Sequence, residues 1–172
     1  MDRCMAGDLL KGKYPDAVLK IMEFRGETSI TIAAGQLRDV MVFLKDSDNC
    51  AYDLLVDLTG IDYGSRSPRF TVVYLLHSMK FNNRLRIKVD VEEGGAVETV
   101  ADIWKAADWL EREAYDMFGI SFSNHPDLRR ILLEEDFAGH PLRKDFPLEG
   151  ADFGTPFNVC LEEERETSRG TS

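Results

Sequence analysis

Cysteine is scarce in this sequence of 172 residues, and its scarcity argues against several kinds of site. Cys4, Cys50 and Cys160 lie far apart, and no Cys-x-x-Cys pair occurs. Iron–sulfur clusters and structural zinc sites need several closely spaced Cys or His ligands, so the sequence predicts neither. Three distant cysteines in a reducing compartment also argue against a disulfide, and we expect three free thiols.

Long apolar runs and an excess of positive charge are absent as well. No apolar run approaches the roughly 18–20 residues that a membrane-spanning helix needs. Residues 1–4 lack the basic and apolar pattern that opens a signal peptide. With 31 acidic and 21 basic residues, the net charge of −10 disfavours binding to nucleic acid or directly to an anionic bilayer. We therefore expect a cytoplasmic chain that reaches a membrane only through a partner protein.

The sequence also lacks the common motifs of nucleotide binding and nucleophilic catalysis. It contains no P-loop, GxGxxG or nucleophile elbow, so neither nucleotide nor NADH binding is predicted on this chain. His77 closes an apolar stretch and is expected in the core or at a strand end. His125 and His140 follow no metal-ligand spacing, but acidic residues such as Asp127 lie nearby. A free-standing metal-dependent enzyme is therefore kept as an alternative hypothesis.

What the sequence does contain is enough apolar residues, 44%, for the core of one domain. Its first zone, about residues 1–98, alternates the patterns of strands and helices. We expect strands at 17–25, 28–33, 54–63, 70–77 and 84–92, and helices at 3–12 and 36–46. The stretch 70–77 is nearly all apolar, as in a strand buried on both faces. The stretch 84–92 alternates apolar and charged residues, so one of its faces is core and the other is solvated or meets a partner.

A second zone predicts one amphipathic helix at about 100–118. Thr99, with Asp102 three residues later, resembles a capping box at its start. Gly119 is a plausible stop at its end. On this helix Trp109 lies toward the polar side, where an isolated domain gains little from a large aromatic side chain.

The charges of this helix indicate structure or contact rather than catalysis. Glu111 and Glu113 are two residues apart and project in different directions, so they cannot act on one substrate together. Arg112 and Asp116 are four residues apart and are expected to pair along the solvent side. An exposed pair contributes only about a few tenths of a kcal/mol, so we expect a partner to bury it.

From residue 120 onward the periodicity is lost, because prolines interrupt the chain repeatedly. We expect a globular domain at 1–119, an extended proline-rich assembly arm at 120–157, and a polar, flexible tail at 158–172. Within the arm, 128–133 could form a short helix or turn. The expected apolar anchors are Phe137, Leu142 and Phe146, and the expected contacts to an acidic partner are Arg129, Arg130, Arg143 and Lys144. The same pattern leaves a free-standing module for an acidic peptide as a further alternative.

The segment 109–147 resembles one family closely. Its matching pieces are Glu111-Arg112-Glu113, Tyr115-Asp116-Met117-Phe118-Gly119, His125-Pro126, Leu128-Arg129-Arg130-Ile131-Leu132 and Gly139-His140-Pro141-Leu142-Arg143-Lys144-Asp145-Phe146-Pro147. In these motifs the sequence resembles the C subunit of proton-pumping NADH:quinone oxidoreductase, respiratory complex I, in its unfused bacterial form. The resemblance agrees with the α+β fold class that the pattern predicts. It implies a two-layer sandwich, in which helices cover a small mixed sheet of about five strands, followed by an extended C-terminal arm.

The resemblance also implies a role and a set of interface residues. The chain would be a structural and assembly subunit of the peripheral arm, held at the cytoplasmic side of the cell membrane. It would pack against the D subunit, with the B and I subunits nearby. Its implied interface residues are Trp109, Glu111, Arg112, Glu113, Asp116, Phe118, Gly119, Arg129, Arg130, Pro141, Leu142, Arg143, Lys144, Asp145 and Pro147. None of them is expected to be catalytic.

The implied complex carries electrons from NADH through FMN and iron–sulfur clusters to quinone and couples this transfer to proton translocation. This chain would bind none of these cofactors. Related subunits occur in membrane-bound hydrogenases and in dehydrogenases with other electron donors, and both stay open as alternatives. On this interpretation, Arg143→Glu is expected to reduce the amount of assembled complex and to leave the isolated domain folded.

Overall fold

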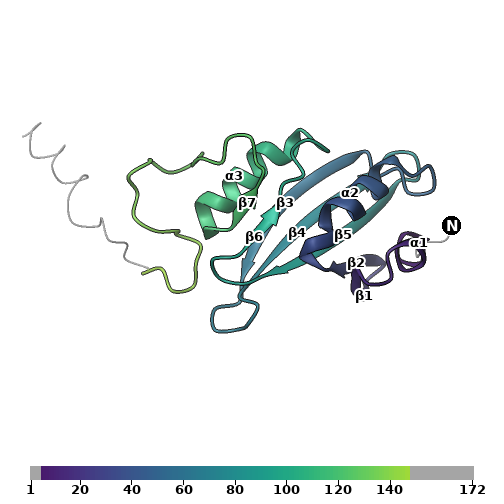
Figure 1. Cartoon of the computed structure of the whole chain (residues 1–172), viewed down its shortest axis with the longest axis horizontal. Helices are drawn as coiled ribbons and strands as arrows, with labels where there is room; N and C mark the ends of the chain where they lie inside the picture. Colours follow the sequence, from purple (N-terminus) through teal and green to yellow (C-terminus); the bar gives the residue numbers. More distant parts are fainter. Residues whose placement is uncertain (1–4, 148–172) are drawn as a thin grey trace, which may run out of the picture.

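The computed structural model describes residues 5–147, and a mixed sheet of five strands forms its centre (Figure 1). The strands are β1 (Val18–Phe24), β2 (Glu27–Ile32), β3 (Leu54–Asp62), β4 (Phe70–Ser78) and β5 (Asn83–Val91). Their order across the sheet is β1-β2-β5-β4-β3. Only β2 and β5 run parallel, and the other neighbours are antiparallel. All five predicted strands are confirmed, with ends that differ by at most one residue.

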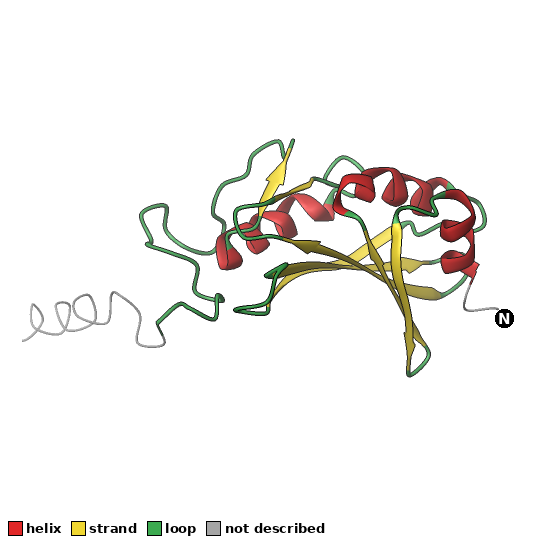
Figure 2. Cartoon of the chain, turned by 60° about the horizontal axis from the view of Figure 1, so that its bottom comes forward, coloured by secondary structure: helices red, strands yellow, loops and turns green. Residues whose placement is uncertain are grey.

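Helices cover one face of this sheet and leave the other without a helix (Figure 2). They are α1 (Met5–Lys13), α2 (Leu37–Asp46), which follows the short 3-10 turn η1 (Ala34–Gln36), and α3 (Ala106–Phe118). The α2 helix follows its apolar periodicity, because its buried residues Leu37, Val40, Met41 and Leu44 recur at helical spacing. The predicted α+β, two-layer architecture is confirmed.

The alternation of β5 decides which face of the sheet meets the helices. Leu85, Ile87 and Val89 are at most 2% exposed and belong to the core. Burying such a side chain stabilises the fold by about 1.5–3 kcal/mol, and the opposite orientation would place charged residues in the core instead. The charged residues between them point to the face that no helix covers. As predicted, β4 is largely buried on both faces.

The helix predicted at 100–118 is shorter than expected and begins at Ala106. Residues 101–103 form a turn, and the predicted capping box is wrong. The hydroxyl of Thr99 instead hydrogen-bonds to the Glu111 carboxylate, and Asp102 forms an ion pair with Arg38 of α2. These long-range partners outweigh the local capping pattern.

A second, two-stranded sheet was missed from the sequence. It pairs β6 (Ala96–Glu98) in parallel with β7 (Ser121–Ser123), which directly follows α3. Strands of three residues are too short to show an alternating pattern. The pairing holds the start of the segment after residue 120 beside residues 96–99, where the Thr99 N–H also donates to the Ser123 carbonyl. The short helix considered at 128–133 is absent, and this stretch is irregular.

Candidate interaction surface

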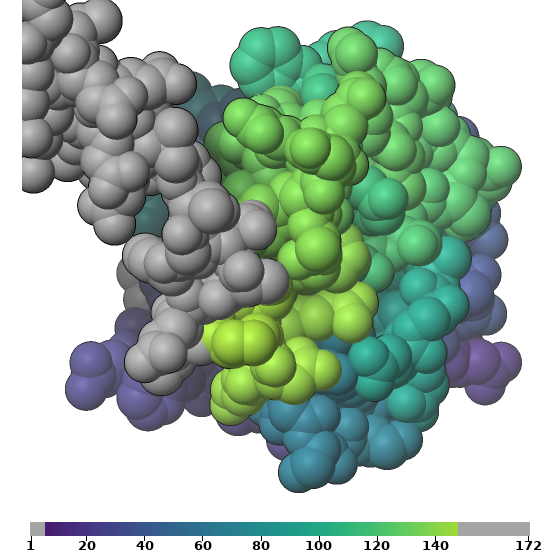
Figure 3. All heavy atoms as spheres, turned by 90° about the vertical axis from the view of Figure 1, so that its left-hand side faces the viewer, coloured from purple at the N-terminus to yellow at the C-terminus, as the bar shows by residue number. Residues whose placement is uncertain are grey.

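The α3 helix and the segment that follows it form one end of the molecule. We call residues 120–147 the described arm, and their atoms run as a continuous band over this end (Figure 3). The predicted tail at 158–172 lies outside the described residues. The most exposed large apolar side chains here are Trp109 on α3, 68% exposed, Leu132, 62%, and Leu142, 55%. Large apolar groups at this exposure contribute little to the core of the domain, and a group of them suits contact with a partner.

Glu111 lies at the centre of the α3 layer and is fully buried. One carboxylate oxygen accepts the hydroxyl hydrogen bond of Thr99, and the other accepts the Val100 N–H at 2.8 Å. Burial raises the pKa of Glu111 to about 7, although the bonds from Thr99 and Val100 oppose this shift. Glu111 therefore holds the turn before α3 in place and does not face a partner.

His125 closes the same buried region from the arm. The Asp127 N–H donates to its Nδ1 at 3.1 Å, so Nδ1 acts as an acceptor. The proton then lies on Nε2, which is 3.1 Å from the Asp108 carbonyl oxygen and 3.8 Å from the Glu111 carboxylate. The ring is thereby fixed as a link between the arm and α3, rather than offered as a ligand.

Asp116 organises the described arm. The sequence places it on the solvent side of α3, but it is fully buried. One of its oxygens accepts the backbone N–H groups of Ile131, Leu132 and Leu133, and the other pairs with the Arg130 guanidinium at 2.7 Å. Burial raises the pKa of Asp116, but these hydrogen bonds outweigh it and leave the pKa below its ordinary value.

The predicted pair between Arg112 and Asp116 is therefore wrong. Arg112 instead donates to the backbone carbonyls of Arg129 and Arg130, at 3.2 Å and 3.0 Å. Arg130 itself also donates to the carbonyls of Phe137 and Gly139. The short-range i, i+4 pattern failed because an irregular backbone offers many free carbonyls, which sequence spacing does not reveal.

The α3 helix ends at Gly119, where the arm packs against it. This residue has φ +72, and its N–H donates to the Tyr115 carbonyl, so the helix ends there as predicted. A Cβ at this position would lie 2.6 Å from the His140 ring. Arg143 packs alongside and donates from Nε to the Phe118 carbonyl at 2.6 Å. Glycine is required here by both the backbone and the close approach of the arm.

Arg69 of the β3–β4 connection was missed from the sequence, although it ties the arm to the sheet. Its guanidinium makes a bidentate pair with Asp62, at 3.0 Å and 2.9 Å, and also contacts Glu93 and Asp145. Hydrogen bonds from Arg69 hold the pKa of Asp62 well below its ordinary value. The Lys144 N–H donates to the same carboxylate at 2.8 Å. No spacing rule joins residues 62, 69 and 145, so only the fold could show this cluster.

The predicted interface residues thus separate by exposure. Glu111, Asp116 and Phe118 are buried; Arg112, Gly119, Arg130, Pro141 and Arg143 are half-buried; Trp109, Glu113, Arg129, Leu142, Lys144, Asp145 and Pro147 are exposed. The buried and half-buried members hold the arm to the domain. The exposed members present their side chains at the surface, where a partner could reach them, although Asp145 is also paired with Arg69.

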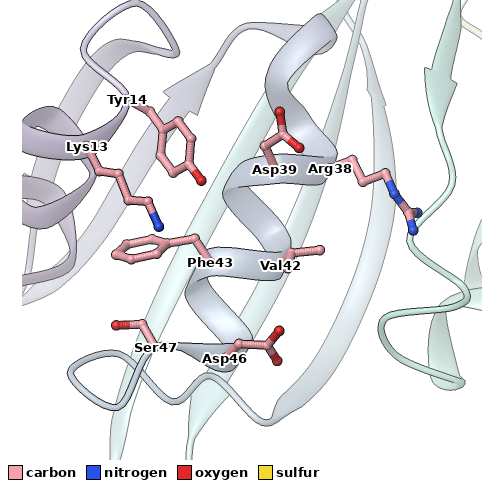
Figure 4. Close-up of a pocket in the computed structure, with 8 residues that line it drawn as sticks. All are labelled: Lys13, Tyr14, Arg38, Asp39, Val42, Phe43, Asp46 and Ser47. Atoms are coloured by element: carbon pink, nitrogen blue, oxygen red, sulfur yellow. The ribbon is translucent and has the colours of Figure 1, made fainter.

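A separate hollow of about 390 Å³ lies beside α2, away from the arm (Figure 4). The Phe43 ring stands in its wall with Tyr14 edge-on at 5.9 Å and the Lys13 ammonium 4.2 Å away. Within residues 5–147, no three His, Cys, Asp or Glu side chains gather closely enough to hold a metal ion. No helix in the described range is long and apolar enough to cross a membrane.

The fold and the signature segment agree with a known class of protein. Residues 30–152 match the family described as the 30 Kd subunit of respiratory-chain NADH dehydrogenase. This match includes the end of β2, all of β3, β4 and β5, the α3 helix and the described arm. The chain belongs to this family.

Relatives with individual names narrow the class further. The chain is 48% identical over 145 residues to the C subunit of the NADH-quinone oxidoreductase of Geobacter sulfurreducens, covering 83% of this chain and 88% of the relative. It is 52% identical over 145 residues to the protein of the same name from Paramagnetospirillum magneticum, covering 84% and 73%.

Two solved structures share the fold. A trypsin-resistant fragment of Nqo5 superposes with a TM-score of 0.62 at 30% identity, over 72% of this chain and 98% of the fragment. A chain of the membrane-bound sulfane sulfur reductase, an archaeal respiratory membrane complex, superposes with a TM-score of 0.70 over 94% and 90%. At 21% identity, this second likeness shows the fold alone.

Proposed function

We propose that this chain is a scaffold subunit in the peripheral arm of NADH-quinone oxidoreductase. It contributes a docking surface and no reaction centre. The observation that carries the proposal is Trp109, a tryptophan left 68% exposed on α3 beside a rigidly held arm. Tryptophan is enriched among residues that dominate binding at protein interfaces.

The internal contacts of the arm support a docking role over a catalytic one. His125, His140 and Asp116 each bind backbone groups within the domain. Groups that are engaged in such bonds are poorer candidates for acid–base or ligand chemistry, and this weakens the hypothesis of a metal-dependent enzyme. Holding the arm in one shape also reduces the entropy lost when its exposed residues dock.

We further propose where the chain stands in the complex. Its partner across α3 and the arm at 120–157 is the D subunit, and the B and I subunits are its neighbours. FMN, the iron–sulfur clusters and quinone belong to other subunits. Cys50 is the one cysteine in the described range, and a single buried thiol cannot supply the ligands of a cluster. The complex holds the chain at the cytoplasmic side of the membrane.

The electron donor in this proposal is NADH. The bacterial relatives are up to 52% identical to this chain and come from NADH-quinone oxidoreductases by name. The likeness to the sulfane sulfur reductase chain is only 21% identical, so the hydrogenase-type and other-donor alternatives have weaker support.

Trp109→Ala tests the docking surface. We expect the variant to fold normally, because the side chain has few contacts to lose. The variant should bind its partner at least about tenfold more weakly, which is the effect expected when a central aromatic is removed from an interface. The complex should then lose this chain more readily on native gels. The measurement is the amount of D subunit that co-purifies with the tagged chain from its own membranes.

Phe81→Ala is the matched control, because Phe81 is also an exposed aromatic, 42%, but lies in the β4–β5 turn. It should leave co-purification unchanged. Arg143→Glu is a poorer probe than the sequence suggested. Its guanidinium binds the Phe118 carbonyl and lies 3.3 Å from Glu93, so the change would disturb the domain itself. Equal retention of the Trp109 and Phe81 variants would reject this surface.

A further inference from the structure

The sheet face opposite the helices, which we call the open face, carries a second ordered surface. Strand register fixes its rows of side chains. One row runs across all five strands as Asp57, Leu75, Arg86, Ser29 and Met22. The next row runs as Thr59, Val73, Lys88, Thr31 and Lys20, and a third begins with Leu54, His77 and Arg84.

These rows place a basic column along the middle strand. Arg84, Arg86 and Lys88 follow one another on β5, and no helix of residues 5–147 lies over them (Figure 2). Arg86 pairs with Glu27 at 2.9 Å. Arg84 is exposed, and neither it nor Lys88 has an ion-pair partner within the described range. Asp90 is the next residue of β5 on this face, so the basic column ends at Lys88.

Apolar side chains border the basic column on both sides. Val56 and Leu54 on β3 are 53% and 45% exposed, and Met22 and Phe24 on β1 are 47% and 67% exposed. A hollow of about 160 Å³ lies beside the column, with Val56 among its lining residues together with Leu75, Arg84 and Arg86. Exposed apolar side chains next to arginine are suited to binding a protein, because arginine is enriched at protein interfaces.

We propose that the open face docks an acidic segment of a neighbouring subunit in the same complex. In this arrangement, carboxylates of the segment lie along Arg84, Arg86 and Lys88, and one apolar side chain enters the hollow beside Val56. Arginine forks suit bidentate contact with carboxylates, which gives such a contact its direction. This surface is separate from α3 and the arm, and the inference rests on the proposed membership of the complex.

The charge pattern favours this occupant over others. A second copy of the chain packed face to face would set one basic column against another, because an isologous contact repeats the same patch. A nucleic acid or an anionic bilayer is larger than this narrow column. Its negative charges would be repelled by the rest of the protein, whose net charge is −10. An acidic protein segment needs only the column and its apolar borders.

The first test is a charge reversal in the intact complex. Arg84→Glu should increase the fraction of this chain that salt washes release from purified complex by about tenfold. Lys88→Gln, a milder change, should act in the same direction. Lys11→Glu is the control, because Lys11 is an exposed lysine of α1 away from this face. Release that is equal for Arg84→Glu and Lys11→Glu overturns the inference.

The second test identifies the occupant. A photo-crosslinking amino acid in place of Val56, in purified complex, should capture an acidic stretch of another subunit. Capture of a second copy of this chain, of its own residues, or of no protein overturns the inference. The two proposals fail separately: loss of co-purification of the unmodified chain with the D subunit rejects complex membership, whereas normal co-purification without a crosslink rejects only the open-face contact.

Discussion

Two carboxylates on the same helix show how burial and bonding together set the behaviour of a residue. Glu111 and Asp116 are both fully buried on α3. Asp116 receives three backbone N–H groups and one guanidinium, and its pKa is lowered. Glu111 receives one N–H group and one hydroxyl, and burial raises its pKa to about 7. Asp116 has more donors and lies less deep among protein atoms than Glu111, so burial prevails only at Glu111.

Glu111 should therefore make stability depend on pH. A carboxyl group whose folded pKa is raised contributes full stability below its unfolded pKa and loses it as the pH rises through the folded pKa. The rise from 4.5 to about 7 corresponds to roughly 3 kcal/mol. Glu111→Gln cannot ionise and can keep bonds to Thr99 and Val100. We expect it to match the wild type at pH 4.5 and to be more stable by up to that amount at pH 8.

Urea unfolding of both proteins across this pH range measures the difference directly, because other titrating groups are common to both. Glu113→Gln is the control, since Glu113 is exposed on the same helix. A constant difference between the Glu111→Gln variant and the wild type at all pH values would contradict a titrating Glu111.

At the scale of helices and strands, an element could be predicted where its apolar residues follow a regular pattern. The α2 helix follows a period of 3.6, β5 follows a period of 2, and β4 is a continuous apolar run. The sequence placed the ends of these elements within one residue. The predicted start of α3 was wrong because the Thr99 hydroxyl bonds to Glu111, twelve residues away, instead of capping the helix.

The arm could be recognised from its sequence, but its internal contacts could not be predicted. Its residues bind side chains of both α3 and the sheet, such as Asp116 paired with Arg130 and Asp62 bonded to the Lys144 N–H. Such contacts have no period. The sequence therefore indicated which residues belong to the surface, but not which of them are turned inward.

Gly119 offers a test of the junction between α3 and the arm. We expect Gly119→Ala to lower the free energy of unfolding by about 1–2 kcal/mol for its left-handed backbone, and by more because the new Cβ displaces His140. Gly12→Ala is the matched control, because nothing lies within 4 Å of a Cβ there. Thermal unfolding of both variants should show a loss only at Gly119; equal midpoints would contradict the close packing of the arm.

At the scale of the whole molecule, the helix side and the open face of one sheet offer two independent surfaces. Trp109 stands on the helix side and Arg84 on the open face, so they share no contact. Free energies of distant, unconnected changes add. The double variant Trp109→Ala, Arg84→Glu should therefore release from the complex by the product of the two single fold-changes, measured by the same salt wash. A double variant no worse than the weaker single variant would mean that the two changes act on one contact.

The position of the arm in the chain also orders events during synthesis. Each group that anchors it, such as the Asp116 carboxylate, the Phe118 carbonyl and the Asp62 carboxylate, precedes it in the sequence. A chain emerging from the ribosome therefore completes its sheet and α3 before the arm exists. Until the arm packs against α3, the Asp116 carboxylate lacks the hydrogen-bond donors that surround it in the folded domain. Within residues 5–147 the docking surface is thus the last part to form, and a partner that binds the arm selects chains in which the sheet and α3 have already folded.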